Sequence, residues 1–496
     1  MIFLLPLHPI KTHYTMKRLF LTWALGLLSA TYASAFKTDG DGSTYTFTKL
    51  AQTPGSGVTM TDQKHFVMSE SVTIAAGDFF CLSDVTYGME VKLGNEVELT
   101  VEGEADLNVP FTFNFTWEGD KPEIEAGSYH STVMTLTRDK ETDVPLGITV
   151  TGGTADKETV VRGIRFEYAG LKNYSQKNMK VQYCEFYRHN GTQSGALFMG
   201  TDGAHFDIDH CTFTECQRAA IGGAANFACP AKVTHCLFVR NSQDNRNIPQ
   251  LNITAASLIE IEDCILRGDS TKNMAGGIGI SNFMQSTGNH VAIRHCEIEM
   301  HRYGITTMGD MDVDISRCTL SDNRYETNPN NGGSGMSFYD PYQKQTVRVS
   351  DCRIERSLWG ITVIGCKDVN LGRIDVDEND TRYNPGNNIF KNNGNGGVLY
   401  DLYNNSANTV YAQGNVWNVR HLTAEEIENV IFHKVDDNQL GEVIYMPAGD
   451  SSLLGIRAVD CQSLRTNGAR FDLQGRPTNV LNKKGIMIVD GKKVVR

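Results

Sequence analysis

The sequence lacks the patterns expected of a zinc-binding, nucleic-acid-binding or membrane-spanning protein. None of its 12 cysteines forms a Cys-x-x-Cys pair, the usual spacing in small zinc sites, so no metal site is predicted. The 46 Lys and Arg are outnumbered by 58 Asp and Glu, and this negative balance opposes binding to nucleic acid or anionic lipid. No apolar run reaches the ~20 residues that span a bilayer, so no membrane span is predicted.

Residues 1–35 are predicted to be an export signal. Lys17 and Arg18 supply its positive charge, a short apolar run follows, and small residues offer a cleavage site. Residues 1–15 do not resemble any part of a signal, which makes Met16 a candidate for the true start. Removal of this segment takes three basic residues from the 46, and the resulting 43 against 58 acidic residues give a net charge of −15.

One short pattern recurs along the chain: an apolar residue, two variable residues, a cysteine, one variable residue and a second apolar residue. The pattern is centred on Cys184, Cys211, Cys236, Cys264, Cys296, Cys318 and Cys352. Successive cysteines are 27, 25, 28, 32, 22 and 34 residues apart. Short strands at a period of ~20–35 residues indicate a stacked architecture of repeats.

A second element follows most of these cysteines, a glycine or alanine that leads a short apolar segment, as at Gly304 and Gly360. β-Branched residues and Gly-rich turns dominate, and helical periodicity is almost absent. A propeller needs about four strands per ~40 residues, more than the shortest repeat of 22 residues can hold. The prediction is therefore an all-β fold, a single-stranded parallel β-helix in which each coil buries its apolar side chains against the next.

The repeated cysteines have a structural and a covalent interpretation. A thiol is small and apolar, so an inward position at a bend would stack it on the same residue one coil away. Disulfides are the alternative in an exported protein, although neighbours ~4.8 Å apart would have poor disulfide geometry. Cys216 and Cys229 lie outside the register and are the best candidates for a bridge.

The repeats suggest a division of the chain, since the ends of a β-helix need caps. A capping box, Thr423 to Glu426, predicts a short helix through Phe432 that covers the last coil. An Asp-Gly pair between apolar runs near the end of the chain predicts a β-hairpin. The predicted units are 36–150 (N-terminal β cap and first coils), 151–447 (β-helix), 448–469 (linker) and 470–496 (small C-terminal β-domain).

Two resemblances extend this prediction. The coil pattern resembles the right-handed parallel β-helix superfamily of pectate lyases and polygalacturonases, which implies a right-handed coil and a polysaccharide partner. The string Asp472-Leu-Gln-Gly-Arg476 followed by Lys483-Lys-Gly-Ile486 and Lys492-Lys-Val-Val495 resembles the C-terminal sorting domain of the Bacteroidetes type IX secretion system. It implies contact with the secretion machinery and passage through the periplasm to the cell surface or the medium.

Catalytic motifs of the superfamily are sparse. No Gly-His-Gly of the hydrolases occurs. Ile208-Asp-His210 is similar to a pectate lyase sequence, but His235 and His295 fill the same register, and a ladder at a bend accounts for all three. No cofactor is predicted from the residues, although a lyase of this superfamily would imply Ca²⁺.

The outer side of the glycine-led strands offers the candidate site. Asp310, Asp340 and Asp401 each follow such a glycine, and stacking would align them as an acidic line able to act as an acid–base pair. The flanking tyrosines could stack on sugar rings as substrate-binding residues: Tyr339, Tyr342, Tyr400 and Tyr403. The alternative is a set of solvated turn residues and surface tyrosines.

Two functions from different classes follow. The first is an exported polysaccharide lyase or glycoside hydrolase that uses the three aspartates. The second is a non-catalytic secreted or surface solenoid that binds glycans or partners along its long face, or serves a purely structural role there.

Overall fold

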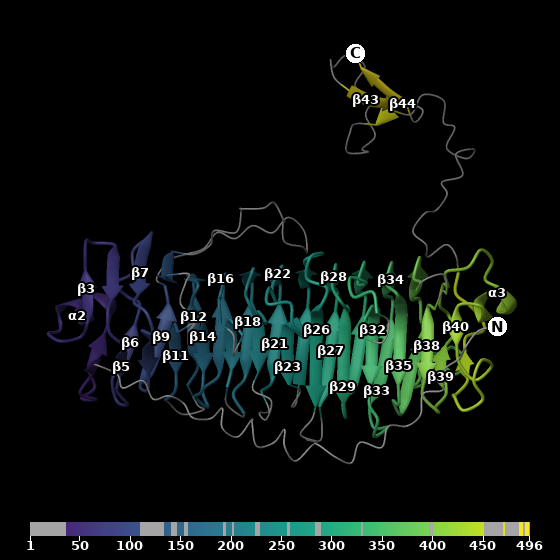
Figure 1. Cartoon of the computed structure of the whole chain (residues 1–496), viewed down its shortest axis with the longest axis horizontal. Helices are drawn as coiled ribbons and strands as arrows, with labels where there is room; N and C mark the ends of the chain where they lie inside the picture. Colours follow the sequence, from purple (N-terminus) through teal and green to yellow (C-terminus); the bar gives the residue numbers. More distant parts are fainter. Residues whose placement is uncertain are drawn as a thin grey trace.

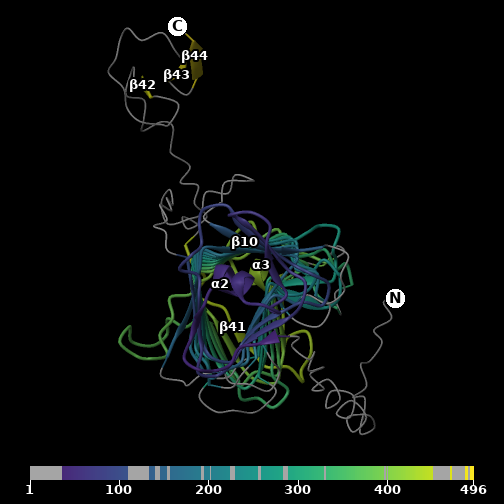
Figure 2. The same ribbon diagram turned by 90° about the vertical axis from the view of Figure 1, so that its left-hand side faces the viewer.

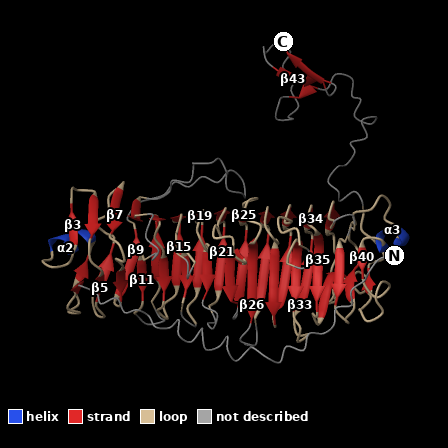
Figure 3. Cartoon of the chain, viewed as in Figure 1, coloured by secondary structure: helices blue, strands red, loops and turns tan. Residues whose placement is uncertain are grey.

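A computed structural model describes residues 36–109, 133–139, 146–152, 157–191, 195–200, 203–223, 229–254, 258–282, 289–328, 331–395, 398, 400–450, 470–471, 486–489 and 492–495. Those between residues 36 and 450 wind into a right-handed parallel β-helix, in which a coil adds one strand to each of three sheets (Figure 1). Seen from the end of the stack, the coils superpose around a common interior (Figure 2). Helix α2 (Phe47–Gln52) lies at one end of the stack and α3 (Ala424–Glu428) at the other (Figure 3). Within the described ranges, no helix has the length and apolar character to cross a membrane.

The three sheets are named A, B and C in the order in which a coil visits them. Sheet A contains β1 (Phe36–Lys37), β5 (Val72–Ile74), β8 (Leu99–Val101), β11 (Ile148–Val150), β14 (Leu171–Asn173), β17 (Leu197–Met199), β20 (Ile221–Gly223), β23 (Ile248–Thr254), β26 (Ala275–Asn282), β29 (Ile305–Gly309), β32 (Ser334–Tyr339), β35 (Trp359–Ile364), β38 (Leu402–Asn405) and β40 (Ile431–Phe432). Sheet B contains β2 (Thr44–Tyr45), β6 (Phe79–Cys81), β9 (Glu104–Asn108), β12 (Thr159–Arg162), β15 (Met179–Gln182), β18 (Phe206–Asp209), β21 (Ala231–Thr234), β24 (Leu258–Glu262), β27 (His290–Arg294), β30 (Asp312–Ser316), β33 (Thr346–Ser350), β36 (Asp368–Gly372), β39 (Val410–Ala412) and β41 (Val443–Ile444). Sheet C contains β3 (Val58–Met60), β4 (His65–Met68), β7 (Met89–Leu93), β10 (Met134–Arg138), β13 (Ile164–Glu167), β16 (Glu185–Tyr187), β19 (Thr212–Thr214), β22 (Leu237–Val239), β25 (Ile265–Arg267), β28 (Glu297–Glu299), β31 (Thr319–Ser321), β34 (Arg353–Glu355) and β37 (Ile389–Lys391).

Neighbouring coils pair in parallel, whereas β3 and β4 at the start of sheet C are antiparallel. The C-terminal strands β42 (Arg470–Phe471), β43 (Ile486–Val489) and β44 (Lys492–Val495) form a separate antiparallel sheet. Strands β43 and β44 flank the Asp-Gly pair predicted to form a turn, and the pair itself lies outside the described residues. The predicted export signal lies outside the described residues.

The predicted cysteine ladder is confirmed. All seven cysteines of the register are buried free thiols at the bend between sheets B and C. Their sulfurs lie near backbone oxygens of their own and the preceding coil; for Cys264, Sγ is 3.3 Å from the Glu262 oxygen and 3.5 Å from that of Val233. Cys216 is also a free thiol, buried at the bend that follows sheet C, so the suggested bridge to Cys229 is not formed.

The bend that carries the ladder is made by a single left-handed residue. In all seven coils the residue before the cysteine has φ between +50° and +55°, yet none of these residues is glycine: Tyr183, His210, His235, Asp263, His295, Arg317 and Asp351. A left-handed residue costs roughly 1–2 kcal/mol, and coil-to-coil pairing on both sides holds the bend in place. The cysteine then lies inside, while the preceding side chain lies partly or fully exposed at the corner.

Rings stack in the interior of sheet C. Phe166, Phe186, Phe213 and Phe238 occupy one register, with ring centroids 4.8, 4.8 and 5.0 Å apart and planes within 5° of parallel. Each ring is buried. This spacing equals the separation of neighbouring strands, so the sheet itself sets the contact.

The C-terminal cap is shorter than predicted. Thr423 caps α3, and its side chain accepts a hydrogen bond from the Glu426 N–H, as the capping box requires. The helix ends at Glu428, however, and residues 431–432 form β40, the last strand of sheet A. The reason is that β38 would otherwise lack a pairing partner on this side; β40 pairs with it, Leu402 with Ile431 and Tyr403 with Phe432.

Truncation of one stacked ring should be costly because it leaves a cavity between two coils. We expect Phe213→Ala to lower the free energy of unfolding by about 3–5 kcal/mol, measured as a shift of the urea midpoint. Tyr87→Ala, which removes a ring that is 67% exposed, is the control and should leave the midpoint nearly unchanged. Equal shifts in the two variants would contradict a stability role for the stack.

Candidate functional site

Aromatic rings gather on the outer face of sheet A near its C-terminal end. Along β38, Leu402 and Asn404 are buried while Tyr403 between them is partly exposed, so its ring lies on the outside. Trp359, Tyr400, Tyr403 and Phe432 form what we name the aromatic platform. Trp359 stacks on Tyr400 at 5.3 Å and on Tyr403 at 5.4 Å, and Phe432 meets both tyrosines edge-on.

A strip of short polar side chains leads away from the platform. Tyr403 pairs with Thr362 in the next coil, Thr362 with Ser337, and Ser337 with Thr306. All lie in the outward register of sheet A, because the residues on either side of each are buried. Ser337 and Thr306 are partly exposed, whereas Thr362 is buried and its hydroxyl lies 3.0 Å from that of Ser334. The sheet therefore offers a short row of hydroxyl groups near the stacked rings.

Two of the predicted aspartates lie at one end of the sheet A strands. Asp310 follows β29 and is about one-third exposed, with its carboxylate 3.5 Å from the Lys344 ammonium. Asp340 follows β32 and is fully buried. Its oxygens accept hydrogen bonds from the backbone N–H groups of Tyr342, Lys344 and Gln345, so this carboxylate closes its own turn.

Asp401 does not join them, which corrects the predicted acidic line. Strand β38 begins at Leu402, which pairs with Ile361, so Asp401 lies beside Gly360 at the opposite end of the strands. The glycine that precedes Asp401 in the predicted pattern is Gly397, which lies outside the described residues. The strand starts later because an insertion lengthens this coil.

Asp401 is buried among polar partners. Its carboxylate accepts hydrogen bonds from the Asn393 amide at 3.0 Å and from the backbone N–H of Asn418 at 2.7 Å. Burial outweighs these bonds and raises the pKa of Asp401 to about 7. The group therefore titrates near neutral pH without being reachable from solvent.

The predicted tyrosines divide into two groups. Tyr339 and Tyr342, 40% and 70% exposed, lie near Asp310 and Asp340. Tyr400 and Tyr403 belong to the platform, together with Trp359 and Phe432, which the sequence analysis did not single out. Trp359 and Tyr400 occupy equivalent positions in successive coils, so aligning the coils strand by strand would have revealed them.

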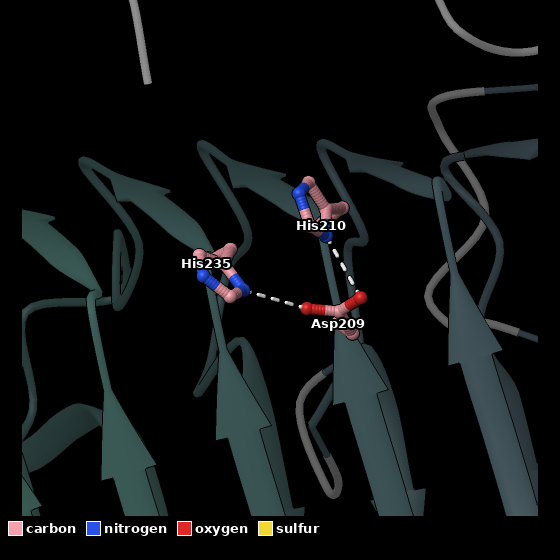
Figure 4. Close-up of side chains that lie close together, drawn as sticks. All are labelled: Asp209, His210 and His235. Atoms are coloured by element: carbon pink, nitrogen blue, oxygen red, sulfur yellow. Dashed lines mark hydrogen bonds and ion pairs between the residues drawn. The ribbon is translucent and has the colours of Figure 1, made fainter. Parts of the chain in front are cut away.

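A second group of side chains lies at the corner between sheets B and C. We name it the corner row: Asp209, His210, His235, Glu262, Asp263 and His295. Asp209 lies between two imidazoles, with its oxygens 2.8 Å from Nδ1 of His210 and 2.9 Å from Nδ1 of His235 (Figure 4). The two rings stack with centroids 4.6 Å apart.

The row continues into the next coils. Nε2 of His235 is 3.7 Å from Asp263, and Nδ1 of His295 is 3.6 Å from Glu262 and 3.7 Å from Asp263. The prediction that the three histidines share one register is confirmed. The sequence analysis treated them as a ladder only, because it did not place the carboxylates of neighbouring coils against them.

The carboxylates of the corner row differ in their environment. Burial opposes ionisation of Asp209, but hydrogen bonds from His210, His235 and Thr234 outweigh it and lower its pKa to about 2. Burial instead raises the pKa of Asp263, despite the nearby His235 and His295. A carboxylate held ionised between two imidazoles can orient both rings or share a cation with them.

Comparison with known proteins gives two similar solved structures. No protein-family model matches the chain. A search of curated proteins gives no match either. Two solved structures are similar to it: the periplasmic alginate epimerase AlgG, with 8% identity and a TM-score of 0.35, and a double mutant of that epimerase, with 10% identity and a TM-score of 0.38. Each similarity covers 82% of this chain and 83% of the other, and at this identity it concerns the fold alone.

Proposed function

We propose that the protein binds a polysaccharide along the outer face of sheet A, with the aromatic platform as the main contact. The observation that carries this proposal is the stacking of Trp359, Tyr400 and Tyr403 beside a row of hydroxyl side chains. Sugar rings present C–H faces that pack on aromatic rings, and hydroxyl groups that bond to polar side chains. Tyrosine and tryptophan, whose apolar rings carry one polar group, suit contacts that remain partly exposed to water.

We further propose that the bound glycan is held rather than cleaved. Lyase or hydrolase chemistry at the predicted residues needs carboxylates that touch the substrate. Asp340 and Asp401 are buried and already accept hydrogen bonds from backbone N–H groups. Asp310 is the exposed member, and it is paired with Lys344 instead of a second carboxylate.

Export belongs to the same proposal. The chain would reach the periplasm through residues 1–35 and then the surface or medium through contacts of residues 470–496 with the secretion machinery. The antiparallel pairing of β43 and β44 supports a separate C-terminal unit.

Loss of platform rings should weaken glycan binding without unfolding the coils. We expect Trp359→Ala and Tyr403→Ala each to reduce affinity about tenfold, or roughly 1.4 kcal/mol, in gels containing uronic-acid or neutral polysaccharides. Tyr87→Ala is the matched control, because it removes an exposed ring far from the platform in sequence. Binding that is equal in all three variants would refute the platform.

The same polysaccharides should show no new reducing ends or unsaturated products after incubation with the protein. Cleavage that disappears in Asp310→Asn would favour the enzymatic alternative instead. Retained binding by this variant, with no turnover in either protein, is the expected result.

A structural role for Asp401 predicts that the free energy of unfolding depends on pH in a specific way. With a folded pKa of about 7 against about 3.9 in the unfolded chain, the folded state keeps its proton over the range in which the unfolded state loses it. The associated stability is therefore present below about pH 4 and is lost as pH rises to about 7. We expect the urea midpoint of Asp401→Asn to lack this decline, whereas Asp310→Asn should retain it. If the urea midpoint of Asp401→Asn falls with pH as much as that of the wild-type protein, the assignment is contradicted.

A further inference from the structure

We propose that the corner row binds divalent transition-metal ions of the Zn²⁺ class. Asp209, His210 and His235 form the first ligand set, and Glu262, Asp263 and His295 form an adjacent second set. This site lies at the bend between sheets B and C, apart from the outer face of sheet A, and is independent of glycan binding. The sequence alone predicted no metal site.

The distances within each set suit a shared ion. In both sets the candidate ligand atoms lie within 4.8 Å of one another. Tetrahedral coordination with bonds of about 2.0–2.2 Å brings ligand atoms to about 3.3–3.6 Å from each other.

The backbone fixes where these side chains begin. Asp209 pairs with Thr234, and Thr234 with Glu262, so the parallel register of sheet B places the carboxylates on every second coil. His210, His235 and Asp263 are themselves the left-handed residues that follow these strands, so all three lie at the same corner.

A supporting contact orients the first set. The Thr234 hydroxyl donates a hydrogen bond to Oδ1 of Asp209 at 2.8 Å. Outer contacts of this kind hold ligands in place and raise metal affinity.

Charge distinguishes the two sets. The Arg317 guanidinium lies 3.3 Å from Nε2 of His295, and this positive group disfavours a cation in the second set. The side chains of the first set are partly exposed, 18% for Asp209, 17% for His210 and 38% for His235, so an ion can enter. The first set is therefore the tighter site.

The donor types select the metal. Two imidazoles and one carboxylate favour Zn²⁺, Ni²⁺ or Cu²⁺, whereas Ca²⁺ and Mg²⁺ prefer sets made only of oxygen. Water would complete the coordination.

Equilibrium dialysis of Zn²⁺ against the full chain tests the proposal, in a Cys461→Ser background that removes a thiol outside the described residues. We expect tight binding that Ca²⁺ does not displace. Asp209→Asn should weaken it about 10–100-fold, and the double variant His210→Gln/His235→Gln should abolish the tight site and leave only the weaker second set. Zn²⁺ should also raise the thermal midpoint of the parent protein and not that of the double variant.

The matched control removes two other histidines that each lie beside a carboxylate. His65 is 2.8 Å from Asp62 and His421 is 2.7 Å from Glu426. The double variant His65→Gln/His421→Gln should bind Zn²⁺ as the parent does. Absence of binding in the parent, or equal binding in the two double variants, would overturn the proposal, with circular dichroism used to confirm that both are folded.

Discussion

Parallel hydrogen bonding between successive coils is the constraint on which the structure depends. It fixes neighbouring strands ~4.8 Å apart and in register, so a residue in one coil faces its equivalent in the next. Inside, this spacing produces the stack of Phe186 and Phe213 and the row of buried thiols. Outside, it brings Thr362 against Tyr403 and Asp209 against Thr234. Any chemistry on the surface is therefore built from one or two side chains per coil.

The same constraint explains what the sequence could predict. Inward positions repeat a narrow range of residue types, because each must pack on its equivalent, and the cysteine register was therefore visible without coordinates. The loops between strands are free to vary in length, so the position of a residue in the next strand cannot be predicted from its spacing along the chain. Asp401 was misplaced for this reason, since an insertion delays the start of β38, and the helix predicted through Phe432 gave way to β40 because the last coil needed a pairing partner.

The chemical role of a carboxylate is harder to predict than its position. Asp340 follows its strand as expected, yet its oxygens satisfy three backbone N–H groups of a tight turn. A catalytic aspartate and a turn-closing aspartate can occupy the same place in a sequence, and only the direction of the side chain separates them. Aromatic residues are less ambiguous on the outside of a sheet. Stacked rings such as Trp359 and Tyr400 leave apolar surface partly in water, a cost that a bound partner removes.

The histidines of the corner row raise the same question of structure against function. Histidine is among the residues enriched in left-handed conformations, so His210 or His235 alone would be explained by the bend. The bend does not require histidine, however, because Tyr183, Arg317 and Asp351 adopt the same conformation in other coils. Nor does the fold require a carboxylate before each left-handed residue, since Gln182 precedes Tyr183 and Ser350 precedes Asp351. Imidazoles and carboxylates converge in the coils from Asp209 to His295, and this convergence exceeds what the backbone demands, which is the physical ground for assigning the corner a ligand.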